Sequence, residues 1–74
     1  KNNLEQAVNC CRRAIRTDPL AEHVHQRLMR LLRRQGLNSA VIKVYRDLTA
    51  KLAVELDTMP DPATTRIYEE MIKK

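Results

Sequence analysis

Apolar residues recur along the chain at the three- and four-residue spacing of amphipathic helices, in four separate segments. The segments run roughly over residues 4–16, 20–35, 39–56 and 62–72. The expected core positions share this spacing and are Leu4, Val8, Cys11, Ile15, Val24, Leu28, Leu31, Leu32, Val41, Val44, Tyr45, Leu48, Leu52, Leu56, Ile67, Tyr68, Met71 and Ile72, with Ala7 and Ala14 beside the first stripe. The pattern predicts an all-α fold of about four helices.

Residues at the ends of these segments predict where the helices begin and end. Asp18 and Asp61 each precede a proline, and this pair suits a helix start because aspartate caps and proline fits the first helical position. Asn38 and Ser39 are candidate caps of the third helix. Gly36 is a natural stop for the second helix, since the position after a helix end favours positive φ. Because the connections are short, successive helices should be antiparallel neighbours.

The first and third predicted helices repeat a pattern of small and apolar residues. Ala7, Cys11, Ala14 and Pro19 have the same relative offsets as Val41, Tyr45, Leu48 and Ala53. The two sets lie 34 residues apart, which is the period of tetratricopeptide repeats. The register predicts antiparallel helical hairpins of the tetratricopeptide type.

Seven stretches, in this order and spacing, resemble the bacterial transcriptional activator domain, the tetratricopeptide-like domain of antibiotic-regulatory-type activators. They are residues 14–22, 28–32, 36, 45–48, 52–56, 60–62 and 67–69. The family's usual Glu-Leu-Gly before the proline reads Glu55-Leu56-Asp57 here. The resemblance implies that residues 1–74 are one such domain, cut from a larger protein. It also implies a regulatory and interaction role, dimerisation in some members, and an upstream winged-helix domain that binds DNA.

Positive charge is concentrated in the first half of the chain. The net charge of +5 lies within residues 1–37, while residues 38–74 are balanced. Such a basic surface attracts nucleic acid, anionic lipid or acidic protein, although solvated helix faces are the simpler explanation, because arginine is a good helix former. No apolar run approaches the roughly 18 residues that would span a membrane. The two cysteines are adjacent and poorly placed to bridge each other, which fits a reducing cytoplasm.

Two histidines and two cysteines invite a metal or catalytic hypothesis. His23 and His25 are two positions apart, so they point to nearly opposite faces of a helix instead of sharing one. Cys10 and Cys11 have no visible third catalytic member or oxyanion feature. We therefore expect no metal, no cofactor and no enzymatic activity.

Arginines of the second helix support two different functions. Arg27, Arg30 and Arg34 form one stripe that could contact DNA phosphates directly. Base reading is less well supported, because only Gln26 and Gln35 accompany the arginines and no aromatic residue is interleaved for stacking.

By resemblance, the second helix lines the concave face of the repeat. Its groove residues would be His23, Gln26, Arg30 and Arg33. Arginines there suit the carboxylates of an acidic peptide, unless they are solvated or pair with Glu5, Glu22 or Asp47. Expected partners are the protein's own DNA-binding domain, RNA polymerase or a second copy, with DNA reached through the upstream domain and no membrane. A small ligand in the groove is a weaker possibility.

The first predicted helix resembles the second helix of a repeat whose first helix is missing. A repeat end without its neighbour leaves apolar surface uncovered. Leu4, Val8 and Ile15 are therefore expected to be partly exposed, and to dock against upstream residues or drive self-association.

Overall fold

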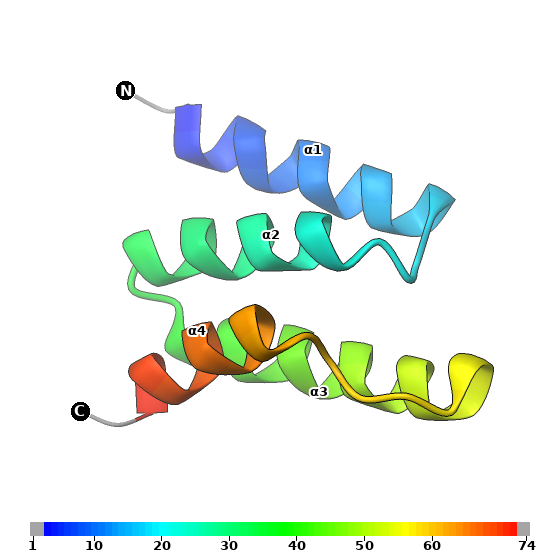
Figure 1. Ribbon diagram of the computed structural model, residues 1–74. Coiled ribbons are helices and arrows are strands. Elements are labelled where there is room, and N and C mark those ends of the chain that lie inside the picture. The colour runs from blue at the N-terminus through cyan, green and yellow to red at the C-terminus, as the bar shows by residue number, and fades with distance from the viewer. Residues whose placement is uncertain (1–2, 73–74) are drawn as a thin grey trace.

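The computed structural model describes residues 3–72, which form four α-helices joined by short connections (Figure 1). Helix α1 spans Asn3–Thr17, α2 spans Glu22–Arg34, α3 spans Asn38–Leu56 and α4 spans Pro62–Ile72. The described residues contain no strand, so the predicted all-α class and the four helices are confirmed. Successive helices run antiparallel (Figure 1).

Helix α2 is the centre of the packing. It contacts α1, α3 and α4, whereas α1 contacts α2 alone. Helices α1, α2 and α3 lie side by side in a layer, and α4 packs against α2 and α3 from one side (Figure 1). The molecule is therefore a thin slab of 39 × 32 × 17 Å, with one face made by α2 and α4 and the other left to α1, α2 and α3.

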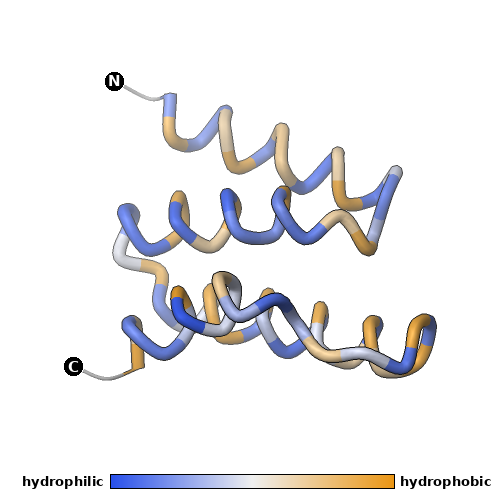
Figure 2. The backbone as a smooth tube through the Cα atoms, viewed as in Figure 1, coloured by the Kyte–Doolittle hydropathy of each residue, from blue (hydrophilic) through white to orange (hydrophobic). Residues whose placement is uncertain are grey.

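The core is aliphatic and is built mainly on α2. Leu28, Met29 and Leu32 are each at most 1% exposed, and Val41 and Leu48 of α3 are fully buried. Burying a side chain of this size contributes about 1.5–3 kcal/mol to folding. Apolar positions gather between the helices while hydrophilic ones face outward (Figure 2).

Two predicted core positions are wrong, and both lie at the C-terminal end of their own helix. Leu56 and Ile72 are 55% and 51% exposed, because each is the last residue of its helix. Val8 was expected to be partly uncovered but is only 6% exposed, whereas Leu4 and Ile15 are half-buried. Met29 was not predicted; it is buried because α2 is covered by three helices, so its buried arc is wider than one stripe.

The predicted start of the second helix is also wrong. Helix α2 begins at Glu22, with Ala21 as its N-cap and no capping side chain. The Ala21 N–H donates instead to the Asp18 carbonyl at 3.1 Å, which closes a turn. Proline is favoured at the second position of such a turn, so the Asp-Pro pair makes a turn before α2 and does not cap it.

The predicted cap of α3 is wrong and the predicted cap of α4 is correct. Helix α3 begins at Asn38 after Leu37, without a capping side chain, so Asn38 and Ser39 are not its caps. The preceding turn is so tight that Asn38 is already helical. The prediction for Asp61 is correct, because its carboxylate oxygen Oδ1 accepts the Ala63 N–H at 3.1 Å at the start of α4.

Two helices end in left-handed residues. Gly36 has φ of 77° as predicted, its N–H donates to the Arg33 carbonyl, and the Leu37 N–H donates to the Leu32 carbonyl. This pair of hydrogen bonds is a Schellman motif. Asp57 has φ of 54° at the end of α3, the position where the family's usual pattern has glycine. Asp57 thus adopts the left-handed conformation that glycine favours, although aspartate adopts it less readily.

We expect Asp57→Gly to raise the free energy of unfolding by about 0.5–1 kcal/mol, because glycine enters the left-handed region without a Cβ clash. Gly36→Ala is the opposite change. Nothing lies within 4 Å of the added Cβ, so the expected loss of stability is purely conformational. Urea unfolding followed by circular dichroism measures both. An Asp57→Gly protein no more stable than Asp57→Ala would contradict this account.

Candidate functional site

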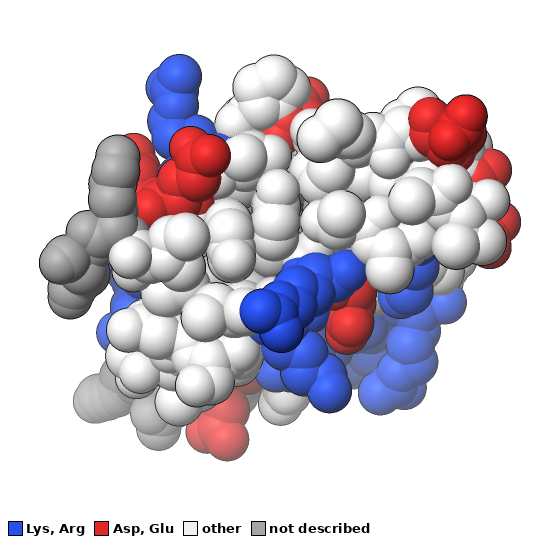
Figure 3. Space-filling model, turned by 90° about the horizontal axis from the view of Figure 1, so that it is seen from below, with Lys and Arg blue, Asp and Glu red and all other residues white. Residues whose placement is uncertain are grey.

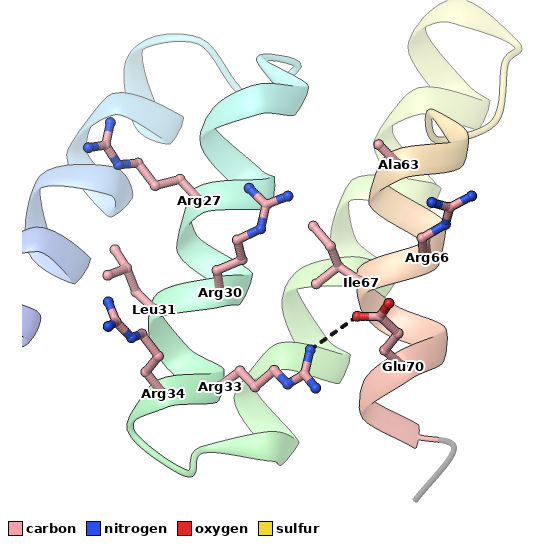
Figure 4. Close-up of a pocket in the computed structure, with 9 residues that line it drawn as sticks. All are labelled: Arg27, Arg30, Leu31, Arg33, Arg34, Ala63, Arg66, Ile67 and Glu70. Atoms are coloured by element: carbon pink, nitrogen blue, oxygen red, sulfur yellow. Dashed lines mark hydrogen bonds and ion pairs between the residues drawn. The ribbon is translucent and has the colours of Figure 1, made fainter.

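A basic groove lies between α2 and α4 (Figure 4). It has a volume of about 870 Å³ and is lined by Arg27, Arg30, Leu31, Arg33, Arg34, Ala63, Arg66, Ile67 and Glu70. Arg30 and Arg33 of α2 and Ile67 and Glu70 of α4 point toward one another, whereas Arg27, Leu31 and Arg34 point toward α1 (Figure 4). We call it the arginine groove. Its five arginines and one glutamate give the lining a net charge of +4.

The structure brings together most of the sequence-predicted site residues. Arg30 and Arg33 of the predicted groove line it, and so do Arg27 and Arg34 of the predicted stripe. His23 and Gln26 do not. His23 lines a hollow between α1 and α2. The Gln26 side chain donates a hydrogen bond to Thr64 of α4.

Sequence reasoning missed the wall that α4 supplies. Arg66 and Glu70 line the arginine groove together with Ala63 and Ile67, and these four positions have the i, i+3, i+4, i+7 spacing of one helix face. The same stripe argument that singled out α2 would have found them. The spacing of residues along the sequence does not show which face of α4 packs toward α2.

Only one ion pair forms among residues 3–72. The Arg33 guanidinium lies 3.4 Å from the Glu70 carboxylate, and both side chains are about half exposed, so the pair contributes little to stability. The sequence left open that the groove arginines pair with Glu5, Glu22 or Asp47. None of these ion pairs forms. Within the described residues Arg27, Arg30, Arg34 and Arg66 have no acidic group within 4.0 Å.

A polar cluster fixes α4 against α2 and so sets the width of the groove. The Thr64 hydroxyl donates to the Glu22 carboxylate at 2.9 Å and accepts the Gln26 amide at 2.8 Å. Glu22 also accepts the Asp61 N–H at the start of α4. Thr64 is fully buried, so these hydrogen bonds satisfy a polar side chain that would otherwise be costly inside the core.

The two cysteines and His23 share the hollow between α1 and α2. Cys10 is exposed and Cys11 is buried. Burial raises the pKa of the Cys11 thiol, and the nearby positive charge of Arg27 lowers it by less. Within residues 3–72 no hydrogen bond joins a thiol to an imidazole, and no three His, Cys, Asp or Glu residues are grouped to hold a metal ion. The arrangement gives no support to nucleophilic or metal chemistry.

Comparison with known protein families gives a match over nearly the whole chain. A family model described as bacterial transcriptional activator domain matches residues 1–72. No curated protein and no solved structure gives a significant match. In the described part of the chain, none of the helices has the length and apolar character that crossing a membrane requires.

Thr64→Val keeps the side-chain volume but removes the hydroxyl that joins Glu22 to Gln26. We expect a loss of about 1–3 kcal/mol in the free energy of unfolding, because two partly buried polar groups lose their partner. Thr58→Val, at an exposed threonine outside the cluster, is the matched control and should change stability by less than about 0.5 kcal/mol. Equal effects of the two substitutions in urea unfolding would show that the cluster does not hold α4.

The cysteines should differ in reactivity. We expect Cys10 to react with Ellman's reagent in the folded protein and Cys11 only on unfolding, because Cys11 is buried and its raised pKa disfavours the thiolate. Cys10→Ser should then remove the fast-reacting thiol. A fast reaction that remains in Cys10→Ser would contradict the burial of Cys11.

Proposed function

The chain belongs to the bacterial transcriptional activator domain family, and on that premise we propose that it is a module through which a larger activator contacts protein partners. The observation that supports this most directly is the arginine groove. Four of its arginines have no acidic partner among residues 3–72, although they line one concave site.

The groove suits an acidic segment of a partner protein. Arginine binds carboxylates through two parallel hydrogen bonds and is weakly hydrated, so it loses less than lysine on leaving water. Leu31 and Ile67 add apolar surface between the arginines, and an apolar side chain of the partner could pack there. A segment that alternates acidic and apolar residues would use both features.

We propose that coupling to transcription runs through such contacts. The partner classes that this chemistry admits are RNA polymerase, the protein's own DNA-binding domain and a second copy of the chain. Leu4 and Ile15 on α1 are half-buried, which supports a further apolar contact on that helix. Recognition of the promoter is proposed to lie in a separate upstream domain, as the family resemblance implies.

Direct contact with DNA is the second candidate function. The unpaired stripe of Arg27, Arg30 and Arg34 favours it, because phosphates need only such a line of positive charge. Two observations weigh against it. Gln26, a candidate base reader, is hydrogen-bonded to Thr64, and Glu70 places a negative charge inside the groove.

Fluorescence anisotropy on promoter and scrambled duplexes across a salt series separates the two functions. Equal weak binding that vanishes with salt would agree with the interaction module. Promoter preference that survives physiological salt would make the arginine groove a DNA-reading surface and overturn the proposal.

We expect Arg30→Glu to weaken binding of a fluorescein-labelled glutamate-rich peptide by about tenfold or more, since tenfold corresponds to only about 1.4 kcal/mol. Arg30 lies at the middle of the groove lining (Figure 4). Arg13→Glu, at an exposed arginine of α1 outside the groove, is the control with the same change in net charge. Equal weakening by both would mean that the peptide senses only overall charge.

Glu70→Gln makes the opposite change to the same site. It removes the single acidic group of the groove and frees Arg33, so the acidic peptide should bind more tightly by a few-fold. Stability should change by less than about 0.5 kcal/mol, because the ion pair is exposed. Unchanged or weaker binding of the peptide would place its site elsewhere.

A further inference from the structure

A second basic hollow lies on the opposite side of α2 from the arginine groove, between α1 and α3. It has a volume of about 240 Å³. Five polar residues line it over an apolar floor: Arg12 and Arg16 of α1, His25 of α2, and Asp47 and Lys51 of α3. We call it the histidine hollow. Positions 25 and 28 of α2 face it, whereas positions 27, 30 and 34 face the groove, as the 100° step of a helix requires.

His25 is the buried member of this site. Its side chain lines the hollow although the residue is only 2% exposed. Its Nδ1 lies 2.9 Å from the Ala21 carbonyl oxygen. A carbonyl oxygen only accepts, so Nδ1 carries a proton and donates it to the backbone of the same helix. The Nε2 atom is on the side of the ring away from that carbonyl, and it has no hydrogen-bond partner among residues 3–72.

The cations around His25 are not neutralised. Arg12, Arg16 and Lys51 line the hollow, and none of them lies within 4.0 Å of an acidic group in the described residues. The carboxylate of Asp47 lies at the same hollow but pairs with none of the three. Seen from below, several Lys and Arg side chains lie together at the lower right of the molecule, with acidic atoms among them (Figure 3).

We propose that the histidine hollow binds inorganic phosphate. Three cations from two helices supply donors from several directions, as a tetrahedral oxyanion requires. Nδ1 of His25 is committed to Ala21, so the Nε2 atom is the ring nitrogen that reports an anion bound in the hollow. The hollow is small, and His25 is held in it by its burial on α2.

Asp47 makes the site selective among oxyanions. A carboxylate repels an anion that has no proton, but it accepts a hydrogen bond from one that carries an O–H group. Hydrogen phosphate has such a group at neutral pH, and sulfate has none. The geometry therefore favours phosphate over sulfate of equal charge.

Nuclear magnetic resonance of the imidazole nitrogens tests this directly. Sodium phosphate is titrated into the labelled protein at constant pH and ionic strength, with sodium chloride as the balancing salt. The expected result is a saturating change of the His25 Nε2 signal, with little change at the exposed His23. A sulfate titration should give a weaker response. Equal responses to phosphate and sulfate, or a His25 signal that does not respond, would overturn the proposal.

Two charge-matched double variants locate the binding. Arg12→Gln with Lys51→Gln removes two cations from the hollow, and phosphate affinity should fall by about tenfold or more, which is about 1.4 kcal/mol. Arg13→Gln with Lys43→Gln removes two exposed cations of the same two helices outside the hollow and should leave the affinity unchanged. Equal affinities of the two variants would overturn the site.

Asp47→Asn tests the selectivity by itself. The amide no longer repels a proton-free anion, so sulfate binding should rise to that of phosphate. A preference for phosphate that is unchanged in Asp47→Asn would show that this carboxylate does not select the anion. All the substituted side chains are exposed, and circular dichroism verifies that each variant remains helical.

Discussion

The burial of α2 against three helices is the constraint on which the rest of the structure depends. Leu28, Met29 and Leu32 are almost completely removed from water, and their neighbours come from α1, α3 and α4. No other helix touches all the others, and α1 is attached only through α2. Loss of packing at α2 would therefore detach α1 and leave α3 and α4 in contact only with each other.

This central position also decides where the charges of α2 can go. The helix is only 13 residues long and carries four arginines among its core residues. The arginine side chains of α2 can reach solvent only between the helices that cover it. All four therefore line the arginine groove. His25 falls on the other side and is buried where α1 and α3 approach α2. Two basic sites of different depth thus follow from one amphipathic helix.

Much of this could be predicted from local sequence. The four helices follow from apolar spacing, and Gly36 and Asp61 act at helix ends as their chemistry predicts. The Asp18-Pro19 pair fails because proline suits both a helix start and the second position of a turn, and the sequence does not distinguish them.

The site was harder to predict than the fold, because it depends on how two helices face each other. The stripe of arginines on α2 was visible from spacing alone, but the facing of Arg66 and Glu70 depends on the orientation of α4. That orientation rests on the Glu22–Thr64 contact, which joins residues 42 positions apart. Hydrogen bonds between such distant residues leave no periodic signal. The exposure of Leu56 was missed for a related reason, since spacing does not tell where a covering helix ends.

The arginine groove has an electrostatic cost that bears on its role. Arg27, Arg30 and Arg34 stand three and four residues apart, and like charges at these spacings destabilise a helix by about 0.2–0.5 kcal/mol per pair. The dipole at the C-terminus of α2 offsets part of this at Arg33 and Arg34. Glu70 offsets another part through its single ion pair.

The repulsion that remains is screened by salt, and an anion that enters the groove would relieve it further. Because such an anion binds the folded chain and not the unfolded one, its binding adds to the stability of the fold in proportion to RT ln(1 + [L]/Kd). A bound acidic partner would therefore tighten α2 against α4, and through α2 it would also steady the helices on the other side. If a partner binds the groove as proposed, the helix that concentrates the charge is also the one that contacts the other three helices.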